Sequence, residues 1–166
     1  VLDCGCGGGA NIRKLLKKCP RGEIKGIDYS PVSVEKSRKV NESAIAEGRC
    51  AVLQGSVADM LFASEWFDVV TAFETVYFWP DLPECFREFY RVLKPGGTFL
   101  ICNECSGDTA KDDKWTEKID GMTIYKDVQL REYLEQAGFC DVQIHKNKRG
   151  WLCVTAEKPV KKRNGE

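Results

Sequence analysis

Apolar positions along this chain follow two different periods, and the change from one to the other predicts strands and helices in turn. Short apolar or β-branched runs predict strands at residues 1–4, 23–28, 50–54, 67–73 and 98–102. The run at 67–73, FDVVTAF, is almost continuously apolar. Such continuity is typical of a parallel strand that is covered on both faces. We therefore expect this strand at the centre of a sheet.

Helices are predicted between these strands. The run NIRKLLKKC has apolar residues at helical spacing, and Pro20 ends that helix before the second strand. Ser30 is an N-cap followed by proline at the first helical position, which predicts a helix running to about Gly48. Two more helices are expected at 81–93, before the turn KPGG, and at 127–137. This alternation predicts an α/β fold with a doubly wound, mostly parallel sheet.

The last third of the chain is expected to depart from this regular alternation. Residues 103–126 are polar and irregular, which predicts a long connection of the kind that often forms a lid. Residues 140–146 and 151–157 flank a turn and predict an antiparallel β-hairpin. The basic residues 159–166 are expected to form a frayed, flexible tail rather than a binding surface.

Length and charge narrow the possible functions. The chain has 166 residues, enough for one core, so a single domain is expected. Lys and Arg total 25 and Asp and Glu also total 25, so the overall charge favours neither nucleic acid nor an anionic membrane as a partner. No membrane-spanning run or signal sequence is recognisable, and the cytoplasm is the expected location.

The cysteines do not indicate a metal or redox site. Nine of them are scattered over predicted strands and helices, an odd number that favours reduced, mostly buried thiols. Cys102 and Cys105 form a C-x-x-C pair, but Cys102 ends an apolar strand and no second pair lies at ligand spacing. We interpret both as strand-end cysteines and expect no metal.

A glycine-rich turn after the first strand is the strongest sign of chemistry. The sequence VLDCGCGGGA places Asp3 at the strand end and Gly5, Gly7 and Gly9 in the turn, directly before a helix. Strand, glycine turn and helix together point backbone N–H groups at a ligand, and glycine lets the backbone approach it closely. We therefore expect a nucleotide-type cofactor at this turn.

Two cofactors fit this loop. The spacing of Gly5, Gly7 and Ala10 matches the dinucleotide fingerprint, and Asp28 follows about 20 residues later, where a ribose-binding acid is expected. Asp3 separates the two cofactors by charge, because a carboxylate at the strand end repels a pyrophosphate and attracts a cation. S-adenosylmethionine carries an ammonium and a sulfonium group and has no phosphate. The loop therefore favours S-adenosylmethionine, and an NAD-dependent oxidoreductase is the alternative.

Four motifs in the expected order resemble the class I S-adenosylmethionine-dependent methyltransferase family over essentially the whole chain. They are VLDCGCGGG, GIDYS, FDVVTAFETVYFWPD and FREFYRVLKPGGTFLI. The resemblance implies a Rossmann-like, doubly wound sheet of seven strands, parallel except for one strand of the C-terminal hairpin. It also implies an S-adenosylmethionine-binding domain over residues 1–158, without the cap helices that precede the first strand in relatives.

The resemblance implies roles for residues at the strand ends. The three turn glycines would line the methionine and ribose portions of S-adenosylmethionine, with Asp3 near the methionine amino group. Asp28 would hold both ribose hydroxyls, because a carboxylate offers two oxygens to a vicinal diol. Tyr29 could pack on the adenine, and Phe73 would lie beside the methionine end.

Adenine recognition departs from the family pattern. Relatives often have an acid after the glycine of GSVADM, whereas this chain has Ser56. The Ser56 hydroxyl, the backbone of Val57 or the side chain of Asp59 could take its place, and the sequence leaves these three possibilities open.

The catalytic candidates follow the fourth strand. Methyl transfer from a sulfonium is an in-line displacement, so alignment and exclusion of water can supply much of the rate without an obligatory base. Where a base helps, Glu74 and Tyr77 are the candidates. Phe78 and Trp79 are more typical of side chains that seat the next helix. The neutral net charge and small size of the chain favour a small-molecule methyl acceptor. Besides a methyltransferase and an oxidoreductase, a non-catalytic binding domain is a third hypothesis.

Overall fold

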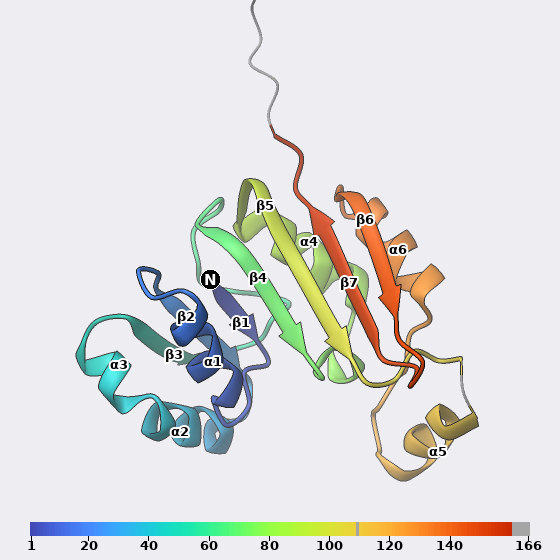
Figure 1. The fold of residues 1–166 in the computed structure, drawn as a ribbon, viewed down its shortest axis with the longest axis horizontal. Helices are drawn as coiled ribbons and strands as arrows, with labels where there is room; N and C mark the ends of the chain where they lie inside the picture. The colour runs from blue at the N-terminus through green and yellow to red at the C-terminus, as the bar shows by residue number, and fades with distance from the viewer. Residues whose placement is uncertain (109, 161–166) are drawn as a thin grey trace, which may run out of the picture.

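The computed structural model describes residues 1–108 and 110–160, which fold around one seven-stranded sheet (Figure 1). In sheet order the strands are β3 (Cys50–Gln54), β2 (Ile24–Asp28), β1 (Leu2–Cys4), β4 (Phe67–Phe73), β5 (Leu93–Asn103), β7 (Leu152–Glu157) and β6 (Cys140–Lys146). Neighbouring strands from β3 to β5 are parallel, whereas β7 is antiparallel to both β5 and β6. The predicted mostly parallel α/β sheet with its C-terminal hairpin is confirmed. Of the predicted tail, residues 161–166 lie outside the described part of the chain.

The order of the strands reverses between β1 and β4. From β1 the chain adds β2 and then β3 on one side, and it then crosses back to place β4 on the other side of β1. In open α/β sheets, ligands bind outside the carboxyl ends of the strands at such a switch point. The glycine turn after β1 and the segment after β4 meet at this end of the sheet, where Gly5 packs against Thr75.

The four expected helices form as α1 (Ala10–Lys18), α2 (Pro31–Val40), α4 (Leu82–Val92) and α6 (Asp127–Gln136). All four begin within a residue or two of the predicted positions, and all but α2 also end there. Side chains cap two of them. The Ser30 hydroxyl accepts a hydrogen bond from the backbone N–H of Ser33 at 3.3 Å, and the Asp81 carboxylate accepts one from Glu84 at 3.0 Å. Such caps satisfy N–H groups that have no partner within the helix. Local sequence therefore determines where α2 and α4 begin.

The single helix predicted over residues 30–48 is wrong, because the chain is divided at Asn41. Helix α2 ends before this residue, and the short helix α3 (Glu42–Ala46) begins after it. The Asn41 side-chain amide donates to the carbonyl oxygen of Ser37 at 2.9 Å and to that of Gly9 at 3.1 Å. The second acceptor belongs to the glycine turn, so a contact between distant segments accompanies the break.

The connection at 103–126, predicted to be irregular, contains the helix α5 (Ala110–Lys118). Figure 1 shows α5 beyond the arrowheads of β4 and β5. Its sequence, AKDDKWTEK, has no apolar stripe at helical spacing, so the periodicity of the sequence does not reveal it. Strand β5 also begins earlier than predicted, at Leu93, which pairs with Phe67 of β4. The backbones of Gly96 and Gly97 then exchange hydrogen bonds with Lys158, at 2.8 and 2.9 Å.

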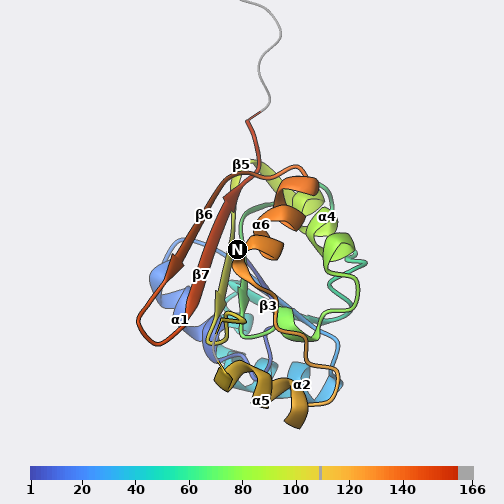
Figure 2. The ribbon, with the colours of Figure 1, turned by 90° about the vertical axis from the view of Figure 1, so that its right-hand side faces the viewer.

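Apolar side chains form two clusters. The smaller one contains Ile12 and Leu16 of α1 and Val34 of α2, packed on β2 and β3. The larger one contains the buried residues of α4 and α6. Figure 2 shows these two helices together on one side of the sheet. The rings of Phe86 and Phe89 in α4 lie 5.5 and 5.0 Å from the ring of Phe99 in β5. These contacts hold α4 firmly against the centre of the sheet.

The described residues show no sign of a membrane span or a metal cluster. No helix there is long and apolar enough to cross a membrane, and no group of three or more His, Cys, Asp or Glu side chains is placed to hold a metal. All nine cysteines are free thiols. Burial raises the pKa of Cys102 to about 12 and that of Cys105 to about 11, so both stay protonated at neutral pH.

Candidate functional site

A cavity of about 640 Å³, the first cavity, opens at the switch point of the sheet. Residues that follow four different strands line it, and they include the predicted cofactor residues Gly5, Gly7, Asp28, Tyr29, Ser56 and Val57. A cavity of this volume is in the range that holds cofactors and other small ligands. Among its described lining residues Asp28 is the only charged one, so the wall offers no cation to a phosphate.

The glycine turn is fixed by backbone hydrogen bonds to the end of β2. The backbone N–H groups of Gly5 and Cys6 both donate to the carbonyl oxygen of Ile27, at 2.8 and 3.1 Å. Gly5 has φ +67°, in the left-handed region that favours glycine. A Cβ atom at this position would lie 1.9 Å from Oγ1 of Thr75. Glycine is therefore required here by both conformation and space.

Asp28 joins the glycine turn to the start of α2. Its Oδ2 accepts a hydrogen bond from the Gly7 N–H at 2.8 Å, and its Oδ1 accepts one from the Ser30 N–H at 3.0 Å. The residue is largely buried but lines the first cavity. A carboxylate has about four lone-pair positions, so two acceptor positions remain for a ligand. The arrangement can hold a vicinal diol while it fixes the turn.

The predicted adenine-side residues lie on two loops of the first cavity. Tyr29 is 77% exposed, so its ring is available to a ligand at the cavity mouth. Val57 is buried, whereas Ser56 is exposed and its Oγ accepts a hydrogen bond from the Ala58 N–H at 3.2 Å. Asp59 is exposed and is absent from the described lining of this cavity. Of the three open possibilities, the geometry favours Ser56 and the backbone of Val57.

Three predicted cofactor residues are not among the residues that line the first cavity. Gly9 packs against α2, where an added Cβ would lie 2.5 Å from Oγ of Ser37. Phe73 lines a neighbouring cavity together with Glu74. Asp3 is 1% exposed beneath the glycine turn. Gly9 therefore supports the shape of the turn, while roles for Asp3 and Phe73 toward a ligand stay predictions.

Asp3 is a buried acid, and only one of its two carboxylate oxygens has a hydrogen-bond partner. Its Oδ1 accepts a hydrogen bond from the Thr71 hydroxyl at 2.8 Å, and its Oδ2 has no partner. Burial is the main cause that raises the pKa of Asp3 to about 7. The Thr71 hydrogen bond opposes this increase, and the charge of Asp28 contributes to it. A cation placed nearby would favour the ionised form.

We expect the substitution Asp3→Asn to stabilise the protein at alkaline pH. Because the pKa of Asp3 is 3.8 ordinarily and about 7 in the fold, the folded chain holds a proton that the unfolded chain has released. Stability should therefore fall as the pH rises from about 4 to about 7. Asparagine does not ionise, so the free energy of unfolding of the variant should exceed that of the parent by on the order of 4 kcal/mol at about pH 8 and by little at about pH 4. Urea unfolding at several pH values measures this, and parallel pH profiles would contradict it.

A second cavity of about 1000 Å³ lies beside the first, on the α5 side of β4 and β5. Its wall contains the predicted catalytic residues Glu74 and Tyr77, and also Glu104, Trp115 and Trp151. Phe78 lines both cavities, so a ligand in one can approach a ligand in the other near this ring. The two cavities together provide adjoining spaces for a donor and an acceptor.

Glu74 and Tyr77 contact each other at the edge of the second cavity. Glu74 has φ +57°, an uncommon value for a residue other than glycine and one that marks local strain. The Tyr77 hydroxyl lies 3.3 Å from Oε2 of Glu74 and accepts a hydrogen bond from the Cys105 N–H at 2.9 Å. Burial is the main cause that raises the pKa values of Glu74 and Tyr77, so Tyr77 remains a phenol at neutral pH. The Tyr77 hydroxyl can therefore donate a hydrogen bond, and of the two side chains it is the Glu74 carboxylate that can accept a proton.

Thr75 and Trp79 are site residues that the sequence did not single out as such. Thr75 lines the first cavity and packs against Gly5. Trp79 lines the same cavity while its ring lies 5.0 Å from that of Phe89 in α4. The prediction that Trp79 seats the next helix is thus confirmed, and the residue borders the cavity as well. The place of Thr75 just after a central strand was the available signal.

Comparison with protein families and curated sequences identifies relatives. Residues 2–101 match the family model described as a methyltransferase domain. Cycloartenol-C-24-methyltransferase 1 of Oryza sativa subsp. japonica is 31% identical over 118 residues, which are 71% of this chain and 34% of that protein. The chloroplastic 2-methyl-6-phytyl-1,4-hydroquinone methyltransferase 1 of the same plant is 27% identical over 154 residues, which are 91% of this chain and 44% of that protein. The chain thus spans less than half the length of these two relatives.

Solved structures share the fold at low sequence identity. Phosphoethanolamine N-methyltransferase 2 of Haemonchus contortus, solved with S-adenosylhomocysteine, superposes with a TM-score of 0.83 at 17% identity, over 95% of this chain and 48% of that one. The cyclase SpnF superposes with a TM-score of 0.79 at 21% identity, over 96% of this chain and 74% of that one. One of these folds carries methyl transfer and the other a cyclisation, so the structural likeness establishes architecture alone.

Proposed function

The chain belongs to the class I S-adenosylmethionine-dependent methyltransferase family, and on that premise we propose that it transfers a methyl group from S-adenosylmethionine in the first cavity to a small molecule in the second. The family assignment decides between the two cofactors that the glycine turn allowed. The observation that carries the proposal is Asp28, a cavity-lining carboxylate that fixes the glycine turn and keeps acceptor positions for a ribose diol.

The residues at the switch point suit S-adenosylmethionine by charge. The first cavity has no Lys or Arg among its described lining residues, which disfavours a pyrophosphate. Asp3, buried beneath the turn with Oδ2 unpartnered, would stabilise the ammonium group of the methionine portion. Gly5 and Gly7 would line its ribose portion, and Ser56 and Val57 would border the adenine.

S-adenosylmethionine supplies an electrophilic methyl group on a positively charged sulfur when it is bound. The protein's part is to align the acceptor with that carbon and to exclude water from it. Phe78, which borders both cavities, would pack against the two ligands where they meet. Glu74 would accept the proton of a hydroxyl or ammonium acceptor, and the Tyr77 hydroxyl would hold Glu74 in position.

The second cavity supports a small molecule as the acceptor. Its volume of about 1000 Å³ is at the upper end of small-ligand sites, and Trp115 and Trp151 provide large apolar faces. The two plant relatives named above are methyltransferases of a sterol and of a hydroquinone by their names. We propose an acceptor of that general kind, a ring-containing small molecule, and we expect no nucleic acid partner.

A labelling experiment tests this proposal. The chain would be incubated with S-adenosylmethionine carrying a labelled methyl group and with a cell extract, which is then separated into small molecules and macromolecules. We expect label among the small molecules, and none above background with the variant Asp28→Ala as a cofactor-binding control. Label in protein or RNA, or no transfer in any fraction, would contradict the proposal.

We keep the cytoplasm as the proposed location. Nine free thiols suit a reducing compartment. Some relatives are chloroplastic by name, so a reducing organelle is the alternative that cell fractionation would distinguish.

A further inference from the structure

The loop between β3 and β4 lines part of the first cavity, although the loop has no regular secondary structure. Residues 55–66, all of which are described, form no helix or strand beyond one isolated bridge between Ser56 and Asp59. Ser56 and Val57 at its start nevertheless line the first cavity. A loop of this kind needs an external support to present its backbone in one position.

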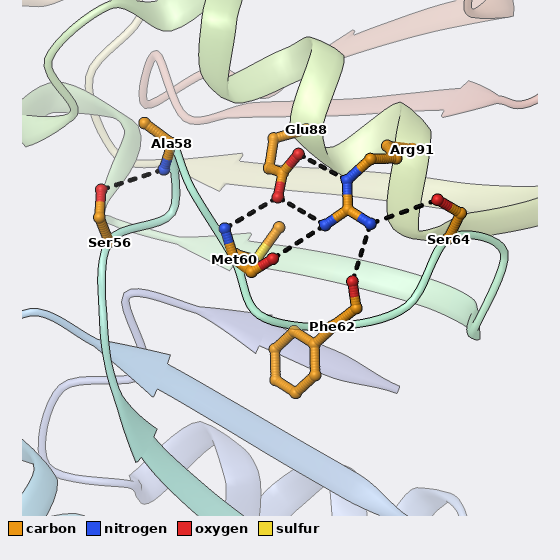
Figure 3. Close-up of polar contacts among 7 residues, drawn as sticks. All are labelled: Ser56, Ala58, Met60, Phe62, Ser64, Glu88 and Arg91. Carbon is orange, nitrogen blue, oxygen red and sulfur yellow. Dashed lines mark hydrogen bonds and ion pairs between the residues drawn. The ribbon is translucent and has the colours of Figure 1, made fainter.

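Arg91 of α4 supplies several of the contacts that hold this loop (Figure 3). Its guanidinium donates to the carbonyl oxygen of Met60 at 2.9 Å and to that of Phe62 at 2.7 Å. A longer contact of 3.3 Å reaches the hydroxyl of Ser64. The planar, forked donor set of arginine is suited to hold several acceptors at once. One side chain thus holds the loop at every second residue from Met60 to Ser64.

Glu88, one turn earlier in α4, completes the arrangement. It accepts two hydrogen bonds from Arg91, at 2.6 and 2.8 Å, and one from the backbone N–H of Met60 at 2.8 Å (Figure 3). The Arg91 hydrogen bond is the main cause that lowers the pKa of Glu88. Met60 is therefore held through both its N–H and its carbonyl oxygen, and its side chain is buried in the larger core cluster.

The same helix carries a second glutamate and arginine pair, Glu84 and Arg87. Glu84 and Arg87 have the same spacing and form an ion pair on the exposed side of α4. Their side chains are 52% and 57% exposed, against 14% for Glu88 and 35% for Arg91. No hydrogen bond from Arg87 to the 55–66 loop is found, so this pair is a natural control for charge and helix propensity.

We propose that Glu88 and Arg91 are positioning residues for cofactor binding, which hold the 55–66 loop so that Ser56 and Val57 meet the adenine edge. The proposal rests on the function proposed above, because it assigns the adenine to this side of the first cavity. It also explains how the adenine could be recognised although Ser56 stands where relatives often have an acid. Without a charged side chain to bind the adenine, backbone groups must do so. They can do so only if the loop is already fixed, because ordering a mobile loop on binding costs free energy.

Paired variants test this role. S-adenosylhomocysteine affinity would be measured for the parent, Arg91→Met and Arg87→Met at a temperature where circular dichroism shows each to be folded. We expect Arg91→Met to weaken binding by about 10-fold and Arg87→Met to leave it within about 2-fold. S-inosylhomocysteine, which has an oxygen in place of the adenine amino group, serves as a second probe. The preference of the parent for S-adenosylhomocysteine should shrink in Arg91→Met and persist in Arg87→Met.

The outcomes separate this proposal from the one on which it rests. Equal affinities in Arg91→Met and Arg87→Met, or an unchanged preference between the two probes, would overturn the positioning role even if Arg91→Met melted earlier. If the parent itself did not bind S-adenosylhomocysteine, the proposed function would be overturned instead. If Arg91→Met does not fold, Arg91→Lys carries the same comparison, because lysine keeps the charge but cannot hold Met60 and Phe62 together.

Discussion

Replacing Asp28 by alanine is expected to weaken the binding of S-adenosylhomocysteine by at least about 100-fold. A hydrogen bond to a charged group contributes about 1.5 to 3 kcal/mol, and the two bonds from the ribose hydroxyls to this carboxylate would be lost. The same carboxylate accepts hydrogen bonds from Gly7 and Ser30, so its removal also frees the glycine turn. Loss of the ribose hydrogen bonds and release of the glycine turn both weaken cofactor binding. Calorimetric titration of the folded variant measures the sum.

The variant Asp28→Asn should produce a smaller loss of the same kind. Asparagine keeps one acceptor oxygen of the same shape, which can hold the Gly7 N–H or the Ser30 N–H but not both. We expect a loss of about 10-fold, between the parent and Asp28→Ala. An Asp28→Ala variant that bound S-adenosylhomocysteine within about 2-fold of the parent would remove Asp28 from the ribose site.

Gly5→Ala is expected to destabilise the fold by about 3 to 5 kcal/mol, combining left-handed backbone strain with overpacking in a filled space. An alanine Cβ would lie 1.9 Å from Oγ1 and 2.8 Å from Cβ of Thr75, which must therefore move. Thr75 follows the central strand β4 and lines the first cavity, so cofactor binding should fall with stability. Thermal and urea unfolding measure the first effect, and titration of the folded fraction measures the second.

Gly48→Ala is the matched control for Gly5→Ala. Gly48 has φ +73°, close to that of Gly5, but nothing lies within 4 Å of a Cβ added there. This variant should cost only the strain, about 1 kcal/mol, and leave binding unchanged. The double variant Gly5→Ala, Thr75→Gly should regain part of the lost stability, because it removes the atoms that clash. Equal costs at Gly5 and Gly48 would show that contact with Thr75 is unimportant.

Much of the fold follows from local patterns that the sequence displays directly. The apolar run of β4, the caps Ser30 and Asp81 and the glycine turn each act within a few residues, so their positions were predictable. The glycine turn also indicated the first cavity, because the requirement for φ above zero is a property of the residue itself. Its neighbour Asp28 was recognisable by its place at the end of β2.

The features that escaped prediction depend on contacts between distant segments. The break at Asn41 involves the carbonyl of Gly9, and the role of Thr75 depends on its packing against Gly5. Glu88 and Arg91 look like an ordinary exposed pair at helical spacing, identical in pattern to Glu84 and Arg87. Only the fold distinguishes the pair that faces the 55–66 loop from the pair that faces solvent. Helix α5 escaped because its sequence has no apolar stripe.

Binding of the cofactor is the claim on which the rest depends, and a calorimetric titration of the chain with S-adenosylhomocysteine and, separately, with NADH tests it most directly. We predict saturable binding of one S-adenosylhomocysteine per chain at micromolar concentration, about −8 kcal/mol, and no heat of binding with NADH. Comparable binding of NADH, or no binding of S-adenosylhomocysteine to the folded chain, would contradict the assignment of the first cavity.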